Sequence, residues 1–294
     1  MNNYPDFCYI RSSDYPAGAI LPRTQVRISP DDRGFYFADG VYEAVRTYAG
    51  KLFRMTEHLQ RFQRSLQAVR INLPDRHNLK QICTELLQRN DLKENDAFFY
   101  IQATRGTAPR NLLFPAPPTL PTLYVSVTPI TPPVREQSTG IRVITVPDIR
   151  WQRCDIKSIG LLASVLARQS AADAGAEEAL FVRNGLITEG THTNLFGVKD
   201  GIILTHPLNN HILPGVTRIV LLELCQRLKL PVQETAISAD SVYELDELFV
   251  TSTTWEVVPV IAVNNRPIGN GQPGPLTRHL QAKFREHCLA TIEH

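Results

Sequence analysis

One lysine of the chain, Lys157, has neighbours that would allow a lysine to do chemistry. The chain has seven lysines, and the other six lie in polar, helical or turn-forming stretches typical of solvated side chains. Lys157 instead follows Ile156 and precedes Ile159. A lysine among apolar side chains either has a lowered pKa or is bound covalently, and both states suit nucleophilic and acid–base catalysis. The alternative is a lysine at the start of a helix whose ammonium group reaches solvent along apolar neighbours.

Other common catalytic signatures do not account for the chain. Residues 269–274 match the nucleotide-binding pattern GxGxxG, but a proline lies inside the pattern and only 20 residues follow it. No βαβ unit with an acidic residue downstream fits there, so we expect a loop before the last helix. The eight histidines lack the spacing of zinc ligands, and the sequence has no Walker, HExxH or GxSxG motif. We therefore expect no metal site.

The elements that must position Lys157 are a mixture of strands and helices. A helix over residues 57–70 is predicted from its apolar period, with Thr56 as its N-cap. Further helices are predicted over residues 77–90, 158–174, 217–229 and 276–290. Strands are predicted over residues 7–11, 24–28, 41–48, 51–55, 97–104, 122–128, 141–146, 179–183, 186–188, 194–199, 202–204, 232–235, 247–252 and 258–263. Because helices and hairpins alternate in both halves, we predict an α+β fold with mostly antiparallel sheets.

The clearest linker is a proline-rich stretch at residues 129–134. Three of its six residues are prolines, which stiffen the chain and end the preceding strand. We predict a small N-terminal α/β domain over residues 1–128 and a larger C-terminal domain over residues 135–294. A chain of 294 residues is long enough for two modest domains.

Composition excludes several classes of protein. The formal net charge is only +2 and the basic residues are scattered, so we expect no nucleic-acid partner. The longest apolar runs are far shorter than the ~18 residues of a membrane helix. The N-terminal residues lack a basic region followed by an apolar run, so no secretory leader is expected. Five cysteines without CxxC spacing fit reduced thiols. We expect a soluble, cytoplasmic protein.

Seven short motifs carry a resemblance that covers nearly the whole chain in one consistent order. They occupy residues 37–43, 57–61, 104–110, 148–158, 188–197, 212–218 and 249–254. Together they resemble the fold-type IV pyridoxal-phosphate aminotransferases, and within that class the D-amino acid aminotransferases. The resemblance implies the two-domain fold of that class, with the cofactor bound by the larger C-terminal domain.

The resemblance implies roles for two reactive groups. Lys157 would form a Schiff base with the aldehyde of pyridoxal 5'-phosphate. Released by the substrate amine, it would then move a proton between the substrate and the cofactor. Glu189 would pair with the pyridine nitrogen and keep it protonated, which makes the ring an electron sink. The alternative for Glu189 is a surface acid in a turn.

The phosphate group of the cofactor needs hydrogen-bond donors. Val216 and Thr217 are expected at the start of a helix, where unpaired backbone N–H groups and the helix dipole favour an anion. The resemblance adds hydroxyl donors from Ser252 and Thr253, and a cation from Arg61. The alternative for Arg61 is an arginine on the solvent face of a helix.

The substrate carboxylate is expected to meet Tyr42 and Arg110. In the D-amino acid aminotransferases the arginine comes from the partner subunit, so the resemblance implies a homodimer. Their third carboxylate ligand is a histidine, and Leu112 stands at its position. Arg46, four residues from Tyr42 on one strand face, is a hypothetical second cation, with an outward-facing strand arginine as the equal alternative. Trp255 is a hypothetical aromatic wall.

The function implied is amino transfer from a D-amino acid to a 2-oxo acid. Loss of one carboxylate ligand at Leu112 leaves open the use of (R)-primary amines or branched-chain amino acids. A lyase of the same fold acting on aminodeoxychorismate is a further alternative, as is a non-catalytic cofactor-binding relative. The retention of both Lys157 and Glu189 favours an enzyme. His192 has no assigned role at this stage.

Overall fold

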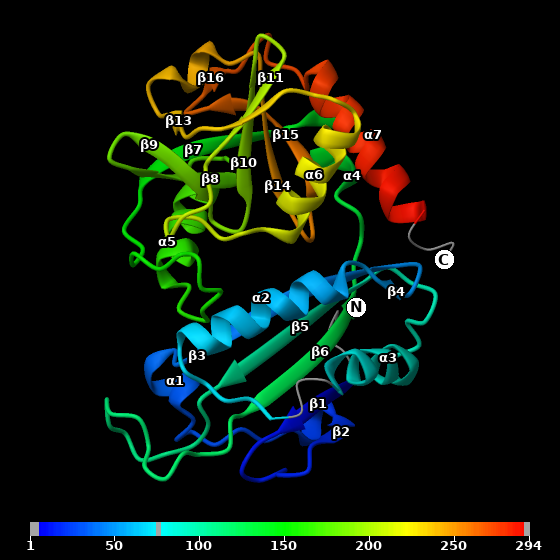
Figure 1. Cartoon of the computed structure of the whole chain (residues 1–294), viewed down its shortest axis with the longest axis vertical. Helices are drawn as coiled ribbons and strands as arrows, with labels where there is room; N and C mark the ends of the chain where they lie inside the picture. Colours follow the sequence, from blue (N-terminus) through cyan, green and yellow to red (C-terminus); the bar gives the residue numbers. More distant parts are fainter. Residues whose placement is uncertain (1–5, 75–77, 291–294) are drawn as a thin grey trace. The chain divides into compact units, whose positions relative to one another are not determined.

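The chain forms two compact units, and each unit consists of two separate stretches of the sequence. The computed structural model describes residues 6–74 and 78–290. The first unit comprises Met1–Thr131 and Ile156–Gly160, and the second comprises Pro132–Asp155 and Leu161–His294 (Figure 1). The first crossing therefore falls inside the proline-rich stretch at 129–134. The segment around Lys157, expected in the C-terminal domain, belongs to the first unit instead.

The first unit is built on a six-stranded antiparallel sheet. Its strands follow the order β2-β1-β6-β5-β3-β4. In β5 every second side chain is buried, starting at Ala97, which matches the two-residue period of a strand with one core face. The strands are β1 (Phe7–Arg11), β2 (Ala19–Pro22), β3 (Gly40–Tyr48), β4 (Lys51–Leu52), β5 (Ala97–Thr104) and β6 (Leu123–Pro129).

Helix α2 (Met55–Ala68) lies along this sheet beside β3 (Figure 1). Its buried Phe62 and Leu66 join strand residues such as Phe99 in one apolar core. The other helices of the unit are α1 (Arg33–Phe37), α3 (Leu79–Arg89) and the 3-10 helix η1 (Arg23–Gln25). Residue 77, the expected first residue of the helix predicted over 77–90, lies outside the described residues.

Two local predictions in this unit are wrong. Thr56 is not the N-cap of α2, because the helix begins at Met55 and Arg54, in a left-handed conformation with φ 51°, occupies the cap. Residues 24–28 do not form a strand. They begin in a 3-10 helix and leave Ile28 51% exposed, so the apolar alternation that predicted a strand has no core to face.

The second unit contains a ten-stranded sheet. The path is β12-β11-β10-β14-β15-β7-β8-β9-β13, and β16 pairs with β15. Three neighbouring pairs are parallel (β7 with β8, β7 with β15, and β11 with β12), and the others are antiparallel. The strands are β7 (Ile141–Pro147), β8 (Glu178–Arg183), β9 (Leu186–Gly190), β10 (Asn194–Lys199), β11 (Ile202–Thr205), β12 (Val232–Glu234), β13 (Ile237–Ser238), β14 (Glu247–Ser252), β15 (Glu256–Val263) and β16 (Arg266–Pro267). The predicted α+β class with mostly antiparallel sheets is confirmed.

The helices of the second unit are α4 (Val134–Thr139), α5 (Leu162–Asp173), η3 (Ser241–Glu244), α6 (Val216–Arg227) and α7 (Pro275–Ala290). Helix α5 connects the parallel strands β7 and β8, as a βαβ crossover requires. The predicted helix over 158–174 begins only at Leu162, because Ser158 forms a β-bridge with Val41 and is therefore extended. In the part of the chain that the structure describes, no helix has the length and apolarity to cross a membrane.

Candidate active site

The backbone of Lys157 is fixed from two sides within the first unit. Its carbonyl oxygen accepts a 2.9 Å hydrogen bond from the Tyr42 N–H of β3, and its own N–H donates to Ser65 Oγ of α2 at 3.1 Å. Its Nζ lies 4.2 Å from the centroid of the Tyr42 ring. The structure thus brings together Lys157 and Tyr42, two residues that the sequence assigned to the cofactor and the substrate. A lysine held in this way has only its own side-chain torsions to adjust.

Arg61 is paired with a buried carboxylate that sequence reasoning missed. Arg61 Nε lies 2.9 Å from Glu43 Oε2, and Arg61 Nη2 lies 2.5 Å from Glu43 Oε1. His58 Nδ1 lies 3.0 Å from the same Oε1 atom. Glu43, His58 and Arg61 are each at most 3% exposed. A signal was present in the sequence, because Glu43 and His58 both lie inside the quoted motifs at 37–43 and 57–61.

Charge and burial oppose each other in this cluster. Burial alone would raise the pKa of Glu43, but the charge of Arg61 and the contacts with His58 lower it well below its usual value. Burial lowers the pKa of His58, with the charges of Arg61 and Lys157 acting in the same direction against the opposing effect of Glu43. The surroundings thus favour the charged form of Glu43 and the neutral form of His58.

Arg46 lies on the same face of β3 as Tyr42 but is engaged elsewhere. Its Nη2 lies 2.8 Å from Asp96 Oδ2, and its guanidinium carbon lies 4.5 Å from the centroid of the Tyr48 ring. Tyr42 itself stacks on Tyr100 with ring centroids 5.5 Å apart. Arg46 is 2% exposed, so it is not the outward-facing arginine of the alternative either, and its substrate role stays a prediction.

Arg110 and Leu112 lie on the long connection between β5 and β6. Both are exposed, and Leu112 is 82% exposed. The Arg110 guanidinium lies 5.2 Å from the centroid of the Phe37 ring. Leu113 is 74% exposed, so two successive leucines of this connection face solvent in the isolated chain.

Glu189, the carboxylate among the predicted site residues, is held in place by three hydrogen bonds. It is 5% exposed and comes from the end of β9. Its Oε1 accepts from Arg150 Nη1 at 2.6 Å, while its Oε2 accepts from Asn194 Nδ2 at 3.1 Å and from the Leu213 N–H at 3.0 Å. Each of these partners donates, so Glu189 is fixed as a hydrogen-bond acceptor. That is the state required to receive an N–H from a protonated ring nitrogen.

Arg150 is a site residue that the sequence did not single out. Its guanidinium also binds Asp148 through Nε at 2.9 Å and Nη2 at 3.0 Å. Burial opposes its charge, yet the hydrogen bonds to Asp148 and the charge of Glu189 hold the pKa of Arg150 above its usual value. The motif at 148–158 contained both Asp148 and Arg150, but only the structure places them against Glu189.

Asn194 connects Glu189 to the predicted phosphate cradle. Besides donating to Glu189, its Nδ2 donates to the Leu213 carbonyl at 2.9 Å. Gly215 caps α6, and a Cβ at that position would lie 2.1 Å from Asn194 Oδ1, so a glycine is required there. Val216 and Thr217 form the first turn of α6 and are buried. The backbone N–H groups and the hydroxyl there are a donor set suited to a phosphate.

Ser252, Thr253 and Trp255 lie close together in sequence at the turn between β14 and β15. Ser252 Oγ accepts from the Trp255 N–H at 3.1 Å. The Trp255 ring meets the His192 ring edge-on with centroids 4.8 Å apart, and the Arg168 guanidinium lies 5.2 Å from its centroid. His192, unassigned from the sequence, is thus a neighbour of the predicted aromatic wall.

A buried carboxylate, Glu178, holds both of the groups that contact Trp255. Glu178 Oε2 lies 3.0 Å from His192 Nδ1, and Glu178 Oε1 lies 3.5 Å from Arg168 Nη1. Burial raises its pKa, but the contacts with His192 and the hydroxyl of Thr191 outweigh burial and lower the pKa of Glu178 to about 2. Glu178 is the first residue of β8, so the carboxylate is fixed by the sheet.

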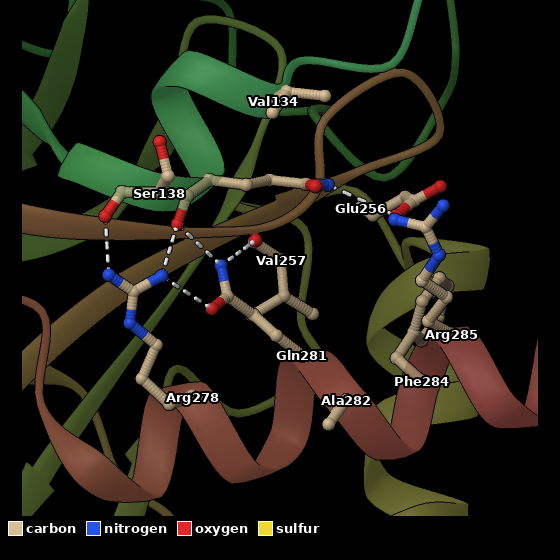
Figure 2. A pocket seen from close by; sticks show the side chains of 10 residues that line it. Val134, Ser138, Glu256, Val257, Arg278, Gln281, Ala282, Phe284 and Arg285 are labelled. Atoms are coloured by element: carbon tan, nitrogen blue, oxygen red, sulfur yellow. Dashed lines mark hydrogen bonds between the residues drawn. The ribbon is translucent and has the colours of Figure 1, made fainter.

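The second unit also has a hollow that none of the predicted site residues line (Figure 2). It has a volume of about 330 Å³ and lies between α4, α7 and β15. Its polar lining is largely occupied by structural contacts: Arg278 donates to the carbonyls of Gln137 and Ser138 at the end of α4, and Gln281 donates to Gln137 and Val257. Such bonds satisfy the last carbonyls of a helix and explain the polarity without a ligand.

Comparisons with known proteins identify the family of the chain. The family model described as amino-transferase class IV matches residues 40–263. A D-alanine aminotransferase from Bacillus licheniformis is 40% identical over 274 residues, which is 93% of this chain and 96% of that protein. The branched-chain amino acid aminotransferase of Escherichia coli superposes with a TM-score of 0.87 at 25% identity, covering 96% of this chain and 94% of that one.

A second solved structure includes a derivative of the cofactor. It is the branched-chain amino acid aminotransferase of T.th. in complex with N-(5'-phosphopyridoxyl)-L-glutamate. It has a TM-score of 0.85 and 28% identity, and the match covers 97% of this chain and 94% of that one. The family, the enzyme class and the cofactor expected from the motifs are confirmed: the chain belongs to the amino-transferase class IV family, the fold-type IV aminotransferases that use pyridoxal 5'-phosphate.

Proposed function

We propose that the chain transfers an amino group from a D-amino acid to a 2-oxo acid, with Lys157 as the reactive amine. The observation that carries the proposal is the fixed backbone of Lys157, bonded to Tyr42 on one side and Ser65 on the other. The D-alanine aminotransferase relative, 40% identical over 93% of the chain, supports the substrate class.

The residues of each unit fit the cofactor by their chemistry. When bound, pyridoxal phosphate supplies an electron sink for a carbanion. Glu189, held by Arg150 and Asn194, would receive the N–H of the pyridine ring and keep its proton in place. The first turn of α6, at Val216 and Thr217, offers backbone donors to the phosphate. Hydroxyls of Ser252 and Thr253 and the guanidinium of Arg61 complete the proposed phosphate contacts.

Lys157 performs the proton transfer. Its amine would hold the cofactor, and Nζ, once freed by the substrate amine, would take the proton from the α-carbon of the amino donor. Tyr42, whose ring lies 4.2 Å from Nζ, is near enough to orient the substrate beside that amine. The proposed partner for the substrate carboxylate is Arg110.

A homodimer is part of the proposal, because Arg110 is assigned to the site of the partner subunit. Exposed apolar side chains support such an interface. Along one face of α5 lie Leu162, Val165 and Leu166, which are 72%, 59% and 54% exposed. Apolar faces of this kind mark protein–protein contacts. The five cysteines are buried thiols, which supports a reducing, cytoplasmic environment.

A second candidate is the transamination of branched-chain amino acids. The observation that favours it is Leu112, an apolar side chain at the expected position of a carboxylate-binding histidine. Solved structures similar in fold include the branched-chain aminotransferase of Escherichia coli. Weaker carboxylate binding also keeps (R)-primary amines among the substrates to be tested.

The test is a half-reaction with the purified cofactor form of the enzyme. Loss of the visible cofactor band is followed after addition of D-alanine, L-alanine, L-leucine or (R)-1-phenylethylamine. D-alanine is expected to react much faster than its enantiomer. Reaction with L-leucine and not with D-alanine would replace the proposal by the branched-chain alternative. A release of pyruvate from aminodeoxychorismate without a 2-oxo acid would indicate the lyase.

A further inference from the structure

The buried carboxylate of Glu43 binds one edge of the Arg61 guanidinium. We propose that Glu43 is a positioning residue that fixes Arg61 relative to Lys157. Through this contact β3 and α2, which hold the Lys157 amine, also fix the position of Arg61, the cation proposed to bind the phosphate. The inference rests on the proposed function, in which Lys157 takes the aldehyde end of the cofactor and Arg61 takes its phosphate.

The contact between Glu43 and Arg61 is a side-on fork. Nε and Nη2 of Arg61 donate to the two carboxylate oxygens at 2.9 and 2.5 Å. Two parallel hydrogen bonds fix the plane of a guanidinium, which one bond to a point charge cannot do. They use two of the five N–H donors of the arginine. The fork therefore orients the plane of the guanidinium.

Glu43 is itself prevented from rotating. Its Oε1 accepts from the Ala44 N–H at 2.8 Å in addition to the contacts with Arg61 and His58. The backbone of Glu43 lies in β3, where it pairs with Ile101 of β5. His58 precedes Arg61 by three residues on α2, so both partners rise from one face of the helix. The carboxylate is thus braced by its own strand and by the helix that carries Arg61.

The same two elements hold Lys157. Tyr42, the residue before Glu43 on β3, donates its N–H to the Lys157 carbonyl. Ser65, four residues after Arg61 on α2, accepts the Lys157 N–H. One dipeptide of β3 and one turn of α2 therefore anchor both the reactive amine and the guanidinium. The separation between them is set inside the first unit.

A structural role alone gives a poor account of the cluster. A buried ion pair contributes little net stability, because the desolvation of both charges offsets their attraction. Well-packed apolar side chains would fill the space between β3 and α2 at least as well. A fork that aims a guanidinium has a use where a second anion, such as a phosphate, must be received in one orientation.

The test compares two ligands on the apoenzyme, pyridoxal 5'-phosphate and pyridoxal, which differ only in the phosphate. Glu43→Gln keeps the shape of the side chain but removes the charge and turns one acceptor into a donor facing Arg61. We expect it to weaken binding of pyridoxal phosphate by about tenfold while changing the Kd for pyridoxal little, as for the loss of one well-placed charge-assisted contact. Equilibrium titration followed by absorbance and by tryptophan fluorescence gives both constants without measuring turnover.

Two further variants keep the result decisive. Glu43→Asp retains the charge, so the protein should still fold, but its side chain is one methylene shorter and reaches Arg61 less well. We expect a smaller loss of affinity for pyridoxal phosphate than in Glu43→Gln. Glu178→Gln is the matched control, because Glu178 is also a fully buried carboxylate between a histidine and an arginine. We expect it to leave the ratio of the two Kd values at the wild-type value.

The outcomes separate the inference from the function on which it rests. A folded Glu43→Asp or Glu43→Gln apoenzyme with the wild-type ratio of Kd values would overturn the positioning role alone. An equal loss of affinity for both ligands would reduce Glu43 to a structural residue and would also overturn it. If the wild-type chain failed to form the visible cofactor band, the proposed function would fail, and the inference with it.

Discussion

Arg150 donates a 2.6 Å hydrogen bond to Glu189 while two further nitrogens of the same guanidinium bind Asp148. One arginine thus neutralises two carboxylates that are at most 7% exposed. In the proposed mechanism this contact keeps Glu189 aimed at the pyridine nitrogen. In that mechanism Arg150 would be a positioning residue for the group that holds the ring proton.

Replacement of Arg150 by Ala is expected to harm both folding and reaction. It leaves two buried carboxylates without their shared cation, which costs roughly 3 kcal/mol of unfolding free energy. Urea unfolding of the holoenzyme measures the loss. Arg153→Ala removes an exposed pair with Asp155 and is the matched control, with a far smaller change expected because exposed ion pairs contribute little. Equal stability of the two variants would show that Arg150 does not stabilise the two buried carboxylates.

Lys157→Ala is expected to lower the rate of the half-reaction by at least about 10³-fold, because it removes both the covalent attachment and the proton carrier. The cofactor should also be lost on dialysis, since no covalent bond retains the aldehyde. Lys199→Ala, at an exposed lysine beside a hairpin turn, should leave both observations unchanged. A Lys157→Ala enzyme with a wild-type rate would show that another amine does the chemistry.

The low pKa of Glu178 predicts an acid-sensitive contribution to stability. A carboxyl whose folded pKa is about 2 and whose unfolded pKa is near 4.5 stabilises the fold fully above pH 5. This contribution, of roughly 3 kcal/mol, is lost as the pH falls from about 5 to 2. The unfolding free energy of the wild type should therefore fall more steeply in this window than that of Glu178→Gln. Parallel curves for the two proteins would show that Glu178 titrates normally.

The apolar face of α5 predicts the surface used by the second subunit. Leu166→Glu places a charge among exposed apolar side chains and is expected to convert a dimer into monomers. Leu289→Glu is the matched control, because Leu289 is 52% exposed against 54% for Leu166 and lies on α7. Light scattering after size exclusion gives the two masses. Two dimeric variants would move the proposed interface away from α5.

Replacement of Leu112 by histidine is expected to increase activity on D-alanine. Leu112→His restores the carboxylate donor expected in D-amino acid aminotransferases, and kcat/KM for D-alanine should rise about tenfold, the effect of one added hydrogen bond to a charged group. The neighbouring Leu113→His, at a similarly exposed leucine, should have no such effect. If the two variants behaved alike, the connection between β5 and β6 would not contribute the carboxylate site at this position.

The sequence predicted those features that depend on local pattern. Strand β5 and helix α7 could be found from the period of their apolar residues, because each buries one face. Lys157 stood out because its neighbours are apolar while the other lysines lie in polar stretches. Motif order then supplied the family, since seven spaced motifs do not arise from periodicity alone.

The partners of the predicted residues could not be derived in the same way. Glu43 and Arg61 are 18 residues apart, and Arg150 and Glu189 are 39 apart, so their contacts depend on which strands and helices become neighbours. Arg46 illustrates the same difficulty from the other side. The sequence correctly placed Arg46 and Tyr42 on the same face of one strand. The guanidinium of Arg46, however, binds Asp96, which is 50 residues away in the sequence. Long-range pairing of charges is a property of topology, which a local pattern does not encode.

The short segment Ile156–Gly160 gives the chain an interleaved connectivity. The polypeptide passes from the first unit to the second after Thr131, returns for five residues, and leaves again before Leu161. A fragment that ends at the proline-rich stretch would therefore lack the stretch that pairs with Val41 and Tyr42. During synthesis the first unit cannot be completed until residue 160 has emerged from the ribosome. Lys157, the proposed reactive lysine, is thus added to its unit late, by a part of the chain that has already entered the other.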